Sequence, residues 1–219
     1  GYTPEAIRDF CDRIGVAKAN SMVDISLLEH CVREDLKSKV ASRNVVENPI
    51  KVVITNYPED SSEFVEVENN KEVPEMGTRM IPFSRELYVD GADFMEVPVK
   101  KYFRLFPGNE VRFKGAYFIK CNEVVKNEDG SIKELLCTYD PETKCGSGFE
   151  GRKVKGTIHF VDAQTAIKVK IRNYNYLMVE DENGNNVINP NSVEETYGYG
   201  EPALAEAKAG ERFQFFRHG

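Results

Sequence analysis

The sequence contains no tryptophan and no long apolar run, although other aromatic residues are frequent. Its longest apolar runs span a few residues, such as residues 52–54, whereas a membrane-spanning helix needs roughly 20. No secretory signal, with a basic end before an apolar stretch, opens the chain. The 13 Phe and 10 Tyr residues favour a packed core over disorder. We therefore expect a cytoplasmic globular protein of one large or two small domains.

The cysteine pattern lacks the marks of a metal site or a disulfide framework. The five cysteines are odd in number and irregular in spacing, with no CxxC pair and no Cys/His set at zinc spacing. We expect five reduced thiols and no bound metal, as is usual in the cytosol. The alternative is a disulfide or metal pair between Cys137 and Cys145.

Signatures of catalysis are missing as well. Residues 146–153 superficially resemble a phosphate-binding loop but lack its closing Gly-Lys-Ser/Thr, and a strand-like run follows instead of a helix. Residues 198–200 lack the third glycine of a dinucleotide-binding turn. No serine or cysteine near a histidine has the context of a nucleophile elbow. We expect no catalytic residue in this chain, and structural or surface roles for His30, His159 and His218.

The net charge of −7 argues against nucleic-acid binding when it is read alone, because phosphates are neutralised by Lys and Arg. The basic residues are nevertheless clustered, and one cluster is interleaved with aromatic residues. Such mixtures suit splayed single-stranded bases, but they also describe the wet face of a β-barrel, and both interpretations remain open here. The clusters are Lys100, Lys101, Arg104, Arg112 and Lys114; Arg152, Lys153 and Lys155; and Lys168, Lys170 and Arg172.

The first forty residues have the pattern of two helices. Thr3 and Pro4 suit the start of one helix, and Gly15 suits its end. Between Asp24 and about Lys37, apolar residues recur at helical spacing. These residues therefore predict a short helical segment before the rest of the chain.

From residue 45 onward the pattern changes to short runs rich in Val, Ile, Phe and Tyr, separated by turn signals. Asp129 and Gly130 predict a tight hairpin turn, and Asn183 with Gly184 predicts a surface loop. Frequent turns between short strands imply an all-β sandwich or barrel rather than a parallel α/β sheet. The strand-like runs are residues 51–56, 64–67, 86–90, 110–113, 117–121, 132–139, 154–161 and 167–174.

Several ordered blocks of sequence carry a resemblance. The chain resembles the C-terminal half of bacterial-type glutaminyl-tRNA synthetases, which are class I enzymes, over nearly its whole length. It begins at Gly1 rather than Met and stops just after the strand-like residues 213–216, so we expect a fragment. The blocks are residues 1–8 (GYTPEAIR), 13–16 (RIGV), 74–79 (PEMGTR), 81–84 (IPFS), 92–94 (ADF), 108–112 (GNEVR), 116–117 (AY), 137–140 (CTYD), 151–159 (GRKVKGTIH), 198–204 (GYGEPAL) and 213–215 (FQF).

The resemblance implies a mainly β fold. It implies two antiparallel β-barrels of the anticodon-binding type, similar to a ribosomal 5S-RNA-binding barrel, after a helical segment at residues 1–40. The proximal barrel would be discontinuous, with residues 41–95 and 165–219, and the distal barrel would be inserted at residues 96–164.

The resemblance also implies residues that hold an anticodon loop. Arg104 matches an arginine that reads the third anticodon base, a guanine, and Arg112 matches one that contacts the first base. Lys114 replaces a family arginine and loses its bidentate fork. Tyr197 replaces a glutamine and could stack on a base. The full set of expected tRNA-binding residues is Arg43, Lys101, Tyr102, Arg104, Arg112, Lys114, Arg152, Lys153, Lys155 and Tyr197.

For the parent enzyme, the resemblance implies attachment of glutamine to tRNA(Gln) with ATP and Mg²⁺. The ATP-binding signatures His-Ile-Gly-His and Lys-Met-Ser-Lys-Ser are absent here, so we expect no cofactor and no catalysis in this chain. The expected partner is tRNA(Gln), with no DNA and no membrane, and the parent is expected to be monomeric. Two alternatives remain: the same region of an archaeal or eukaryotic-type glutamyl-tRNA synthetase, and a non-enzymatic RNA-binding β-barrel protein.

Overall fold

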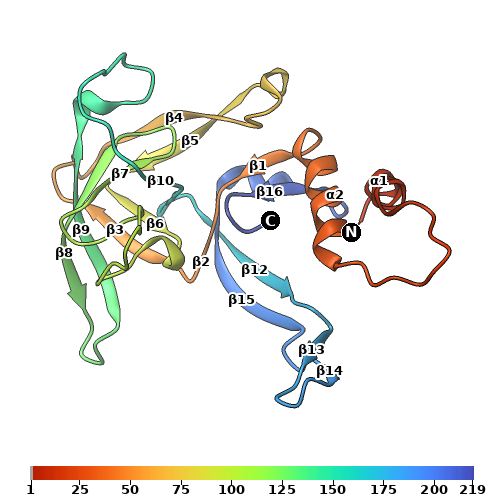
Figure 1. Ribbon diagram of the computed structural model, residues 1–219. Coiled ribbons are helices and arrows are strands. Elements are labelled where there is room, and N and C mark those ends of the chain that lie inside the picture. The colour runs from red at the N-terminus through yellow and green to blue at the C-terminus, as the bar shows by residue number, and fades with distance from the viewer. Residues whose placement is uncertain (1) are drawn as a thin grey trace.

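Two helices open the chain, as the sequence predicts. The computed structural model describes residues 2–219, so the expectation for Gly1 lies outside the described residues. Helix α1 spans Pro4–Ile14 and α2 spans Ile25–Lys37. The side chains of Thr3 and Asp24 each accept a backbone N–H at the start of a helix. The helices pack against each other at one end of the molecule (Figure 1). No helix among the described residues is long and apolar enough to cross a membrane.

The remaining chain is built from short strands, which confirms the mainly β fold. Most neighbouring strands are antiparallel, but β1–β16, β3–β9 and β7–β10 pair in parallel. The strands are β1 (Ala41–Arg43), β2 (Val45–Glu47), β3 (Ile50–Ile54), β4 (Ser62–Glu68), β5 (Thr78–Ser84), β6 (Glu86–Val89), β7 (Glu110–Phe113), β8 (Phe118–Lys126), β9 (Ile132–Asp140), β10 (Thr157–Ile158), β11 (Val161–Asp162), β12 (Ile167–Tyr174), β13 (Met178–Glu180), β14 (Asn186–Ile188), β15 (Val193–Gly200) and β16 (Phe213–Phe215).

The largest sheet has seven strands in the order β10-β7-β8-β9-β3-β6-β11. Its two edge strands, β10 and β11, follow each other in the chain with only His159 and Phe160 between them. Because so short a link joins the two edges, the sheet must curl back on itself. It therefore has a barrel-like form, with β4 and β5 as an antiparallel ribbon beside it (Figure 1).

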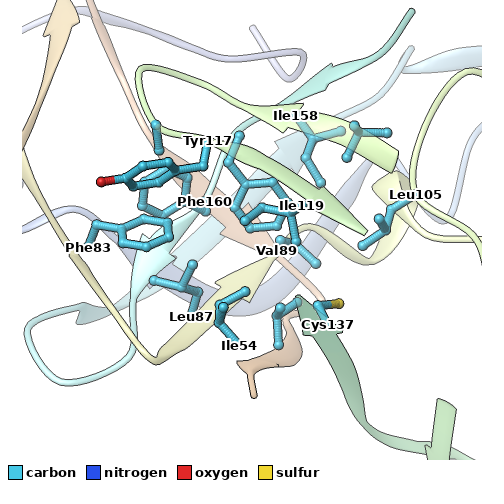
Figure 2. Close-up of a cluster of buried hydrophobic side chains, with 14 of the residues drawn as sticks. Ile54, Phe83, Leu87, Val89, Leu105, Tyr117, Ile119, Cys137, Ile158 and Phe160 are labelled. Atoms are coloured by element: carbon cyan, nitrogen blue, oxygen red, sulfur yellow. The ribbon is translucent and has the colours of Figure 1, made fainter. Parts of the chain in front are cut away.

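Buried side chains of this sheet and of the β4–β5 ribbon pack together in one core (Figure 2). Phe83 is fully buried, and its ring lies 5.5 Å from that of Phe160 in an edge-to-face arrangement. The rings of Tyr57 and Tyr117 are each 5.4 Å from Phe83. Such aromatic pairs add about 0.5–1.5 kcal/mol each beyond the area that they bury. Part of the aromatic content of the sequence thus fills this core.

A second, smaller sheet has the order β12-β15-β2. Strands β12 and β15 form a long antiparallel ribbon that extends from the body of the molecule, with the β13–β14 hairpin at its tip (Figure 1). No residue of β12 is buried, and only Gly198 and Gly200 are buried in β15. The ribbon therefore has almost no core of its own.

The strand pairing does not follow the predicted boundaries of the two barrels. Strands β3 and β6, from the predicted proximal barrel, pair with β9 and β11, from the predicted distal barrel. Residues 96–164 thus share one sheet with residues 50–54 and 86–89 rather than forming a sheet alone. The sequence pattern could not show this, because pairing between strands about eighty residues apart depends on how the whole core packs.

A buried carboxylate joins the β12-β15-β2 sheet to the β4–β5 ribbon. Glu201, only 2% exposed, follows β15 and accepts two hydrogen bonds from Arg79 of β5, at 2.7 and 2.8 Å. The backbone N–H of Asn44, between β1 and β2, donates to the same carboxylate at 2.9 Å. Arg43 adds an ion pair at 3.6 Å. Since a buried charge is tolerated only when it is paired and hydrogen-bonded, this cluster fixes the junction between the small sheet and the β4–β5 ribbon.

Candidate nucleic-acid interface

Two adjoining hollows lie on the surface beside β7 and β10, and both are lined by aromatic and basic side chains. The first hollow has a volume of about 500 Å³ and the second about 400 Å³. Lys153 and Val154 line both, so the hollows form one continuous surface. The first is lined by Arg112, Phe118, Phe149, Glu150, Gly151, Arg152, Lys153, Val154 and Thr157, and the second by Tyr102, Phe103, Phe106, Asn109, Glu110, Lys153, Val154, Lys155 and Gly156.

In the first hollow, two guanidinium groups stack on aromatic rings. The Arg112 guanidinium lies 4.2 Å from the centre of the Phe118 ring. Arg152 lies 5.3 Å from the same ring and 5.8 Å from the ring of Phe149. Backbone carbonyls, including that of Thr143 at 3.1 Å, accept hydrogen bonds from Arg112. Arg112 is therefore held in place by the ring and the carbonyls. Its planar guanidinium is the kind of group that pairs with a base edge or a phosphate.

Two carboxylates hold Arg152. Glu110 accepts two hydrogen bonds from it, at 2.8 and 2.7 Å, and Asp140 accepts a third at 2.7 Å. The hydrogen bonds to Glu110 and then to Asp140 raise the pKa of Arg152. The guanidinium is nearly half exposed, so water screens these ion pairs. A phosphate that binds Arg152 must therefore compete with two carboxylates.

In the second hollow, aromatic side chains predominate. Phe103 is 49% exposed, and the ammonium of Lys155 lies 5.3 Å from its ring centre. The rings of Tyr102 and Phe106 lie 6.4 Å apart, and burial raises the pKa of Tyr102. A Cβ on Gly156 would meet the carbonyl oxygen of Phe103 at 1.8 Å, so only glycine allows the wall of this hollow to close.

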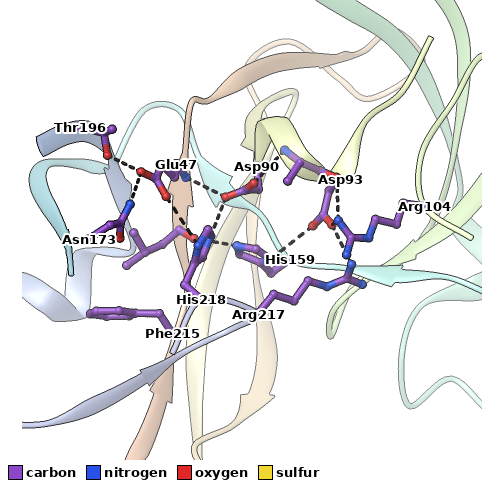
Figure 3. A network of polar contacts seen from close by, with 12 residues as sticks. Glu47, Asp90, Asp93, Arg104, His159, Asn173, Thr196, Phe215, Arg217 and His218 are labelled. Atoms are coloured by element: carbon purple, nitrogen blue, oxygen red, sulfur yellow. Dashed lines mark hydrogen bonds and ion pairs between the residues drawn. The ribbon is translucent and has the colours of Figure 1, made fainter. Parts of the chain in front are cut away.

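Five predicted residues thus line the hollows: Tyr102, Arg112, Arg152, Lys153 and Lys155. Lys101 lies beside them, exposed, with a left-handed φ of 67° in the turn before Tyr102. Arg104 is next along the chain, but its guanidinium donates to the carbonyl of Ala92 at 2.7 Å. It also lies 3.4 Å from the buried carboxylate of Asp93 (Figure 3). Arg104 is therefore held by Ala92 and Asp93 and lines neither hollow.

The other three predicted residues lie elsewhere. Arg43, on β1, stacks 5.2 Å from the ring of Phe213 and is partly buried at the Glu201 junction. Lys114 follows β7 and lies 4.6 Å from the ring centre of Phe216, where burial lowers its pKa. Tyr197 is 57% exposed on β15. The structure therefore does not gather these three with the residues of the hollows.

Sequence reasoning missed two residues that line the first hollow and two that hold Arg152. Phe118 and Phe149 supply its rings, while Glu110 and Asp140 hold Arg152. Phe118 begins an apolar strand and looks like a core residue in the sequence. Glu110 could have been found from the sequence, because it lies in the same basic and aromatic cluster as Arg112.

His159 and His218 form part of a separate polar network between the two sheets (Figure 3). The buried His159 contacts the carbonyl oxygen of Val45 at 2.7 Å, and burial lowers its pKa to about 4. His218 contacts Asp90 at 2.8 Å. Among the residues that the structure describes, possible ligand atoms of Asp90, His159 and His218 lie within 4.8 Å of one another. His159 and His218 thus hold the β10–β11 link and the end of the chain against β2.

Comparison with known proteins identifies the family. Residues 42–140 and 157–219 each match a model described as "tRNA synthetases class I (E and Q), anti-codon binding domain". Over the whole chain, the sequence is 55% identical to the "Glutamine--tRNA ligase" of Clostridium perfringens, 53% to that of Clostridioides difficile and 46% to that of Nitrosomonas europaea. The chain spans 41% of the length of each of these relatives. The resemblance seen in the sequence is thereby confirmed, and the chain belongs to the anticodon-binding domain family of the class I tRNA synthetases for glutamate and glutamine.

Proposed function

We propose that this chain binds the anticodon loop of tRNA(Gln) as the C-terminal part of a longer glutamine–tRNA ligase. The parent enzyme would attach glutamine to the tRNA with ATP and Mg²⁺, in the cytoplasm and as a monomer. The family match and the names of the relatives support this proposal. The chain itself would contribute recognition rather than catalysis, since the ATP-binding signatures are absent from its sequence.

The two adjoining hollows are the main structural support for this proposal. Single-stranded RNA is recognised by unstacking its bases onto aromatic rings and by placing Arg or Lys against phosphates and base edges. The two hollows combine these groups within one surface, with Arg112 and Lys155 already stacked on Phe118 and Phe103. We propose that two neighbouring anticodon bases occupy them, while Lys153 meets the phosphate between.

We propose a division of the chain that differs from the one predicted from the sequence. The sheets support a first unit of residues 48–163, which contains the seven-stranded sheet, and a second unit of residues 41–47 and 164–219. The second unit would carry Tyr197 on the ribbon, and the first would carry the hollows. An anticodon loop would then contact the first unit with at least two bases.

Binding to tRNA tests the proposal directly. Fluorescence anisotropy would compare a tRNA(Gln) transcript with one whose third anticodon base is changed. We expect tighter binding of the first, and an affinity that falls steeply with salt despite the net charge of −7, because local clusters release counterions. Arg112→Ala should weaken binding, whereas Lys133→Ala, an exposed residue of β9 remote from the cluster in sequence, serves as a matched control. Equal affinity for both tRNAs with no salt dependence would refute the proposal.

The family description also covers glutamate-specific enzymes, and this gives a second candidate. An archaeal or eukaryotic-type glutamyl-tRNA synthetase would present the same domains to a different anticodon. Competition between tRNA(Gln) and tRNA(Glu) for the chain distinguishes the two, because only the cognate anticodon should compete well. The names of the relatives favour glutamine.

A further inference from the structure

Two cysteines face each other in the core of the seven-stranded sheet. Cys121 of β8 and Cys137 of β9 are directly opposite in the register of the two strands, and both are fully buried. All five cysteines are free thiols, and Cys145 is exposed outside the core. The alternative of a Cys137–Cys145 disulfide is therefore wrong. The neighbour of Cys137 is Cys121 (Figure 2 shows Cys137 in the core).

The backbone shows which kind of pair this is. The N–H of Cys121 donates to Asn109 at 3.1 Å, and its carbonyl accepts from Gly108 at 2.8 Å. The carbonyl of Cys137 accepts from Thr55 of the next segment at 2.8 Å. None of these backbone groups bonds to the opposite cysteine, so Cys121 and Cys137 form a non-hydrogen-bonded pair. Such pairs have Cα atoms about 4.5 Å apart, within the range of about 4.4–6.8 Å that a disulfide spans.

An irregularity in strand β8 and the chemistry of the two thiols also favour a disulfide between Cys121 and Cys137. The register shifts immediately after Cys121, as in a β-bulge, which increases the local twist and lets side chains reorient. A hydrogen bond from the Cys137 thiol lowers the pKa of the Cys121 thiol. The same hydrogen bond, followed by burial, raises the pKa of Cys137. Cys121 is therefore the sulfur that becomes a thiolate first and attacks an oxidant.

We propose that Cys121 and Cys137 are a modification site, at which a small-molecule disulfide oxidises the two thiols to a reversible cross-strand disulfide. The Cys121 thiolate attacks the small disulfide, forming a mixed disulfide and releasing one small thiolate. Cys137 then loses its proton and attacks the Cys121 sulfur, which releases the second small thiolate. Two protein thiols are oxidised, and one small disulfide is reduced to two thiols when the two released thiolates take up the protons lost by Cys121 and Cys137.

The site is coupled to the second hollow by backbone hydrogen bonds. Cys121 holds both Gly108 and Asn109, and the Asn109 side chain lines the hollow and donates to the carbonyl of Arg104 at 2.8 Å. A disulfide would fix the strand that supports this turn. Because both thiols are buried, oxidation needs a local opening of the β8–β9 pair. The oxidation rate should therefore rise several-fold in urea below the unfolding transition.

Thiol mapping tests the site without changing the core. The protein would carry Cys11→Ser and Cys145→Ser, which remove the two exposed thiols. It would be oxidised with glutathione disulfide, then alkylated in denaturant and mapped under non-reducing conditions. We expect a peptide that links Cys121 to Cys137, with loss of two alkylatable thiols and retention of Cys31. Reduction with dithiothreitol should restore both thiols, and the oxidised protein should unfold at higher urea.

Two further variants serve as controls in the same background. Adding Cys121→Ser should leave Cys137 alkylatable, whereas adding Cys31→Ser should leave the linked peptide intact. Retention of all three thiols after oxidation up to the onset of unfolding would overturn the proposal. A linkage between Cys31 and either core cysteine, or only mixed disulfides with glutathione, would also overturn it. These outcomes do not depend on RNA binding, so the proposed function can fail independently.

Discussion

The seven-stranded sheet and the β12–β15 ribbon are both built from β-strands, but they are stabilised in different ways. The sheet encloses fully buried side chains such as Phe83, Leu87 and Ile119, whereas β12 alternates between partly buried and exposed positions. Large apolar side chains near the ribbon tip, including Leu177 and Ile188, are mostly exposed. This chain therefore contains one self-sufficient core and one ribbon that depends on its attachments. Those attachments are the β2 pairing and the junction around Glu201.

The largest expected effect comes from the core itself. Phe83→Ala should destabilise the protein by about 3–5 kcal/mol, because it removes a fully buried ring and leaves a cavity. The matched change in the ribbon, Leu177→Ala, should stay within about 0.5 kcal/mol, since that side chain is 63% exposed. Urea unfolding followed by fluorescence or circular dichroism measures both. Similar losses in the two variants would show that the ribbon has a core of its own.

The next largest effect on stability is expected at the junction around Glu201. Glu201→Ala should cost roughly 3 kcal/mol, because it leaves the guanidinium groups of Arg79 and Arg43 without their buried partner. Amide hydrogen exchange should show whether the ribbon opens before the sheet does. Protection lost in β12 and β15 but kept in β8 and β9 is the expected pattern. The exposed pair of Arg172 and Glu195 provides a control, since Glu195→Ala should have little effect.

A pH effect of about 2–3 kcal/mol should come from His159, which lies between the two regions. Burial lowers its pKa to about 4 from an ordinary value of 6.5. The unfolded chain therefore binds a proton between these pH values while the folded protein does not, so stability is complete above pH 6.5 and is lost as the pH falls toward 4. Unfolding of the protein and of His159→Gln would be compared across this range. Identical pH slopes would remove His159 as the cause.

The smallest expected effects concern recognition. Arg104→Ala should reduce discrimination at the third anticodon base by about 1–3 kcal/mol if its resemblance to a guanine-reading arginine holds. Lys155→Ala should weaken binding of all tRNAs about equally, because a lysine beside an exposed ring more readily meets phosphate. Affinities of cognate and third-base-changed tRNA measure the gap. Arg104 must first leave Ala92 and Asp93, so an unchanged gap in Arg104→Ala would assign the reading to the hollows instead.

Local features of the fold could be predicted from the sequence, and distant pairings could not. Thr3, Asp24 and the Asp129–Gly130 turn act through neighbours a few residues away, and the structure places a helix start or a hairpin turn at each. The parallel pairing of β3 with β9 depends on a core assembled from segments far apart in the chain, which no local pattern contains. The same reason explains why the carboxylates that hold Arg152 escaped notice. Nevertheless, five of the ten residues predicted to bind tRNA line the hollows.

Lys153 borders both hollows, and this gives their occupancy a thermodynamic link. When a ligand group in one hollow immobilises the lysine side chain, the side chain loses its conformational entropy. A second group in the other hollow then binds without that entropic cost. If both ligand groups compete for the single ammonium, the second group instead gains less binding free energy than it would alone. In either case the energies of the two subsites cannot be additive. Recognition of two adjacent bases would then be a single cooperative event, whose strength a double-mutant cycle between Arg112 and Lys155 would measure.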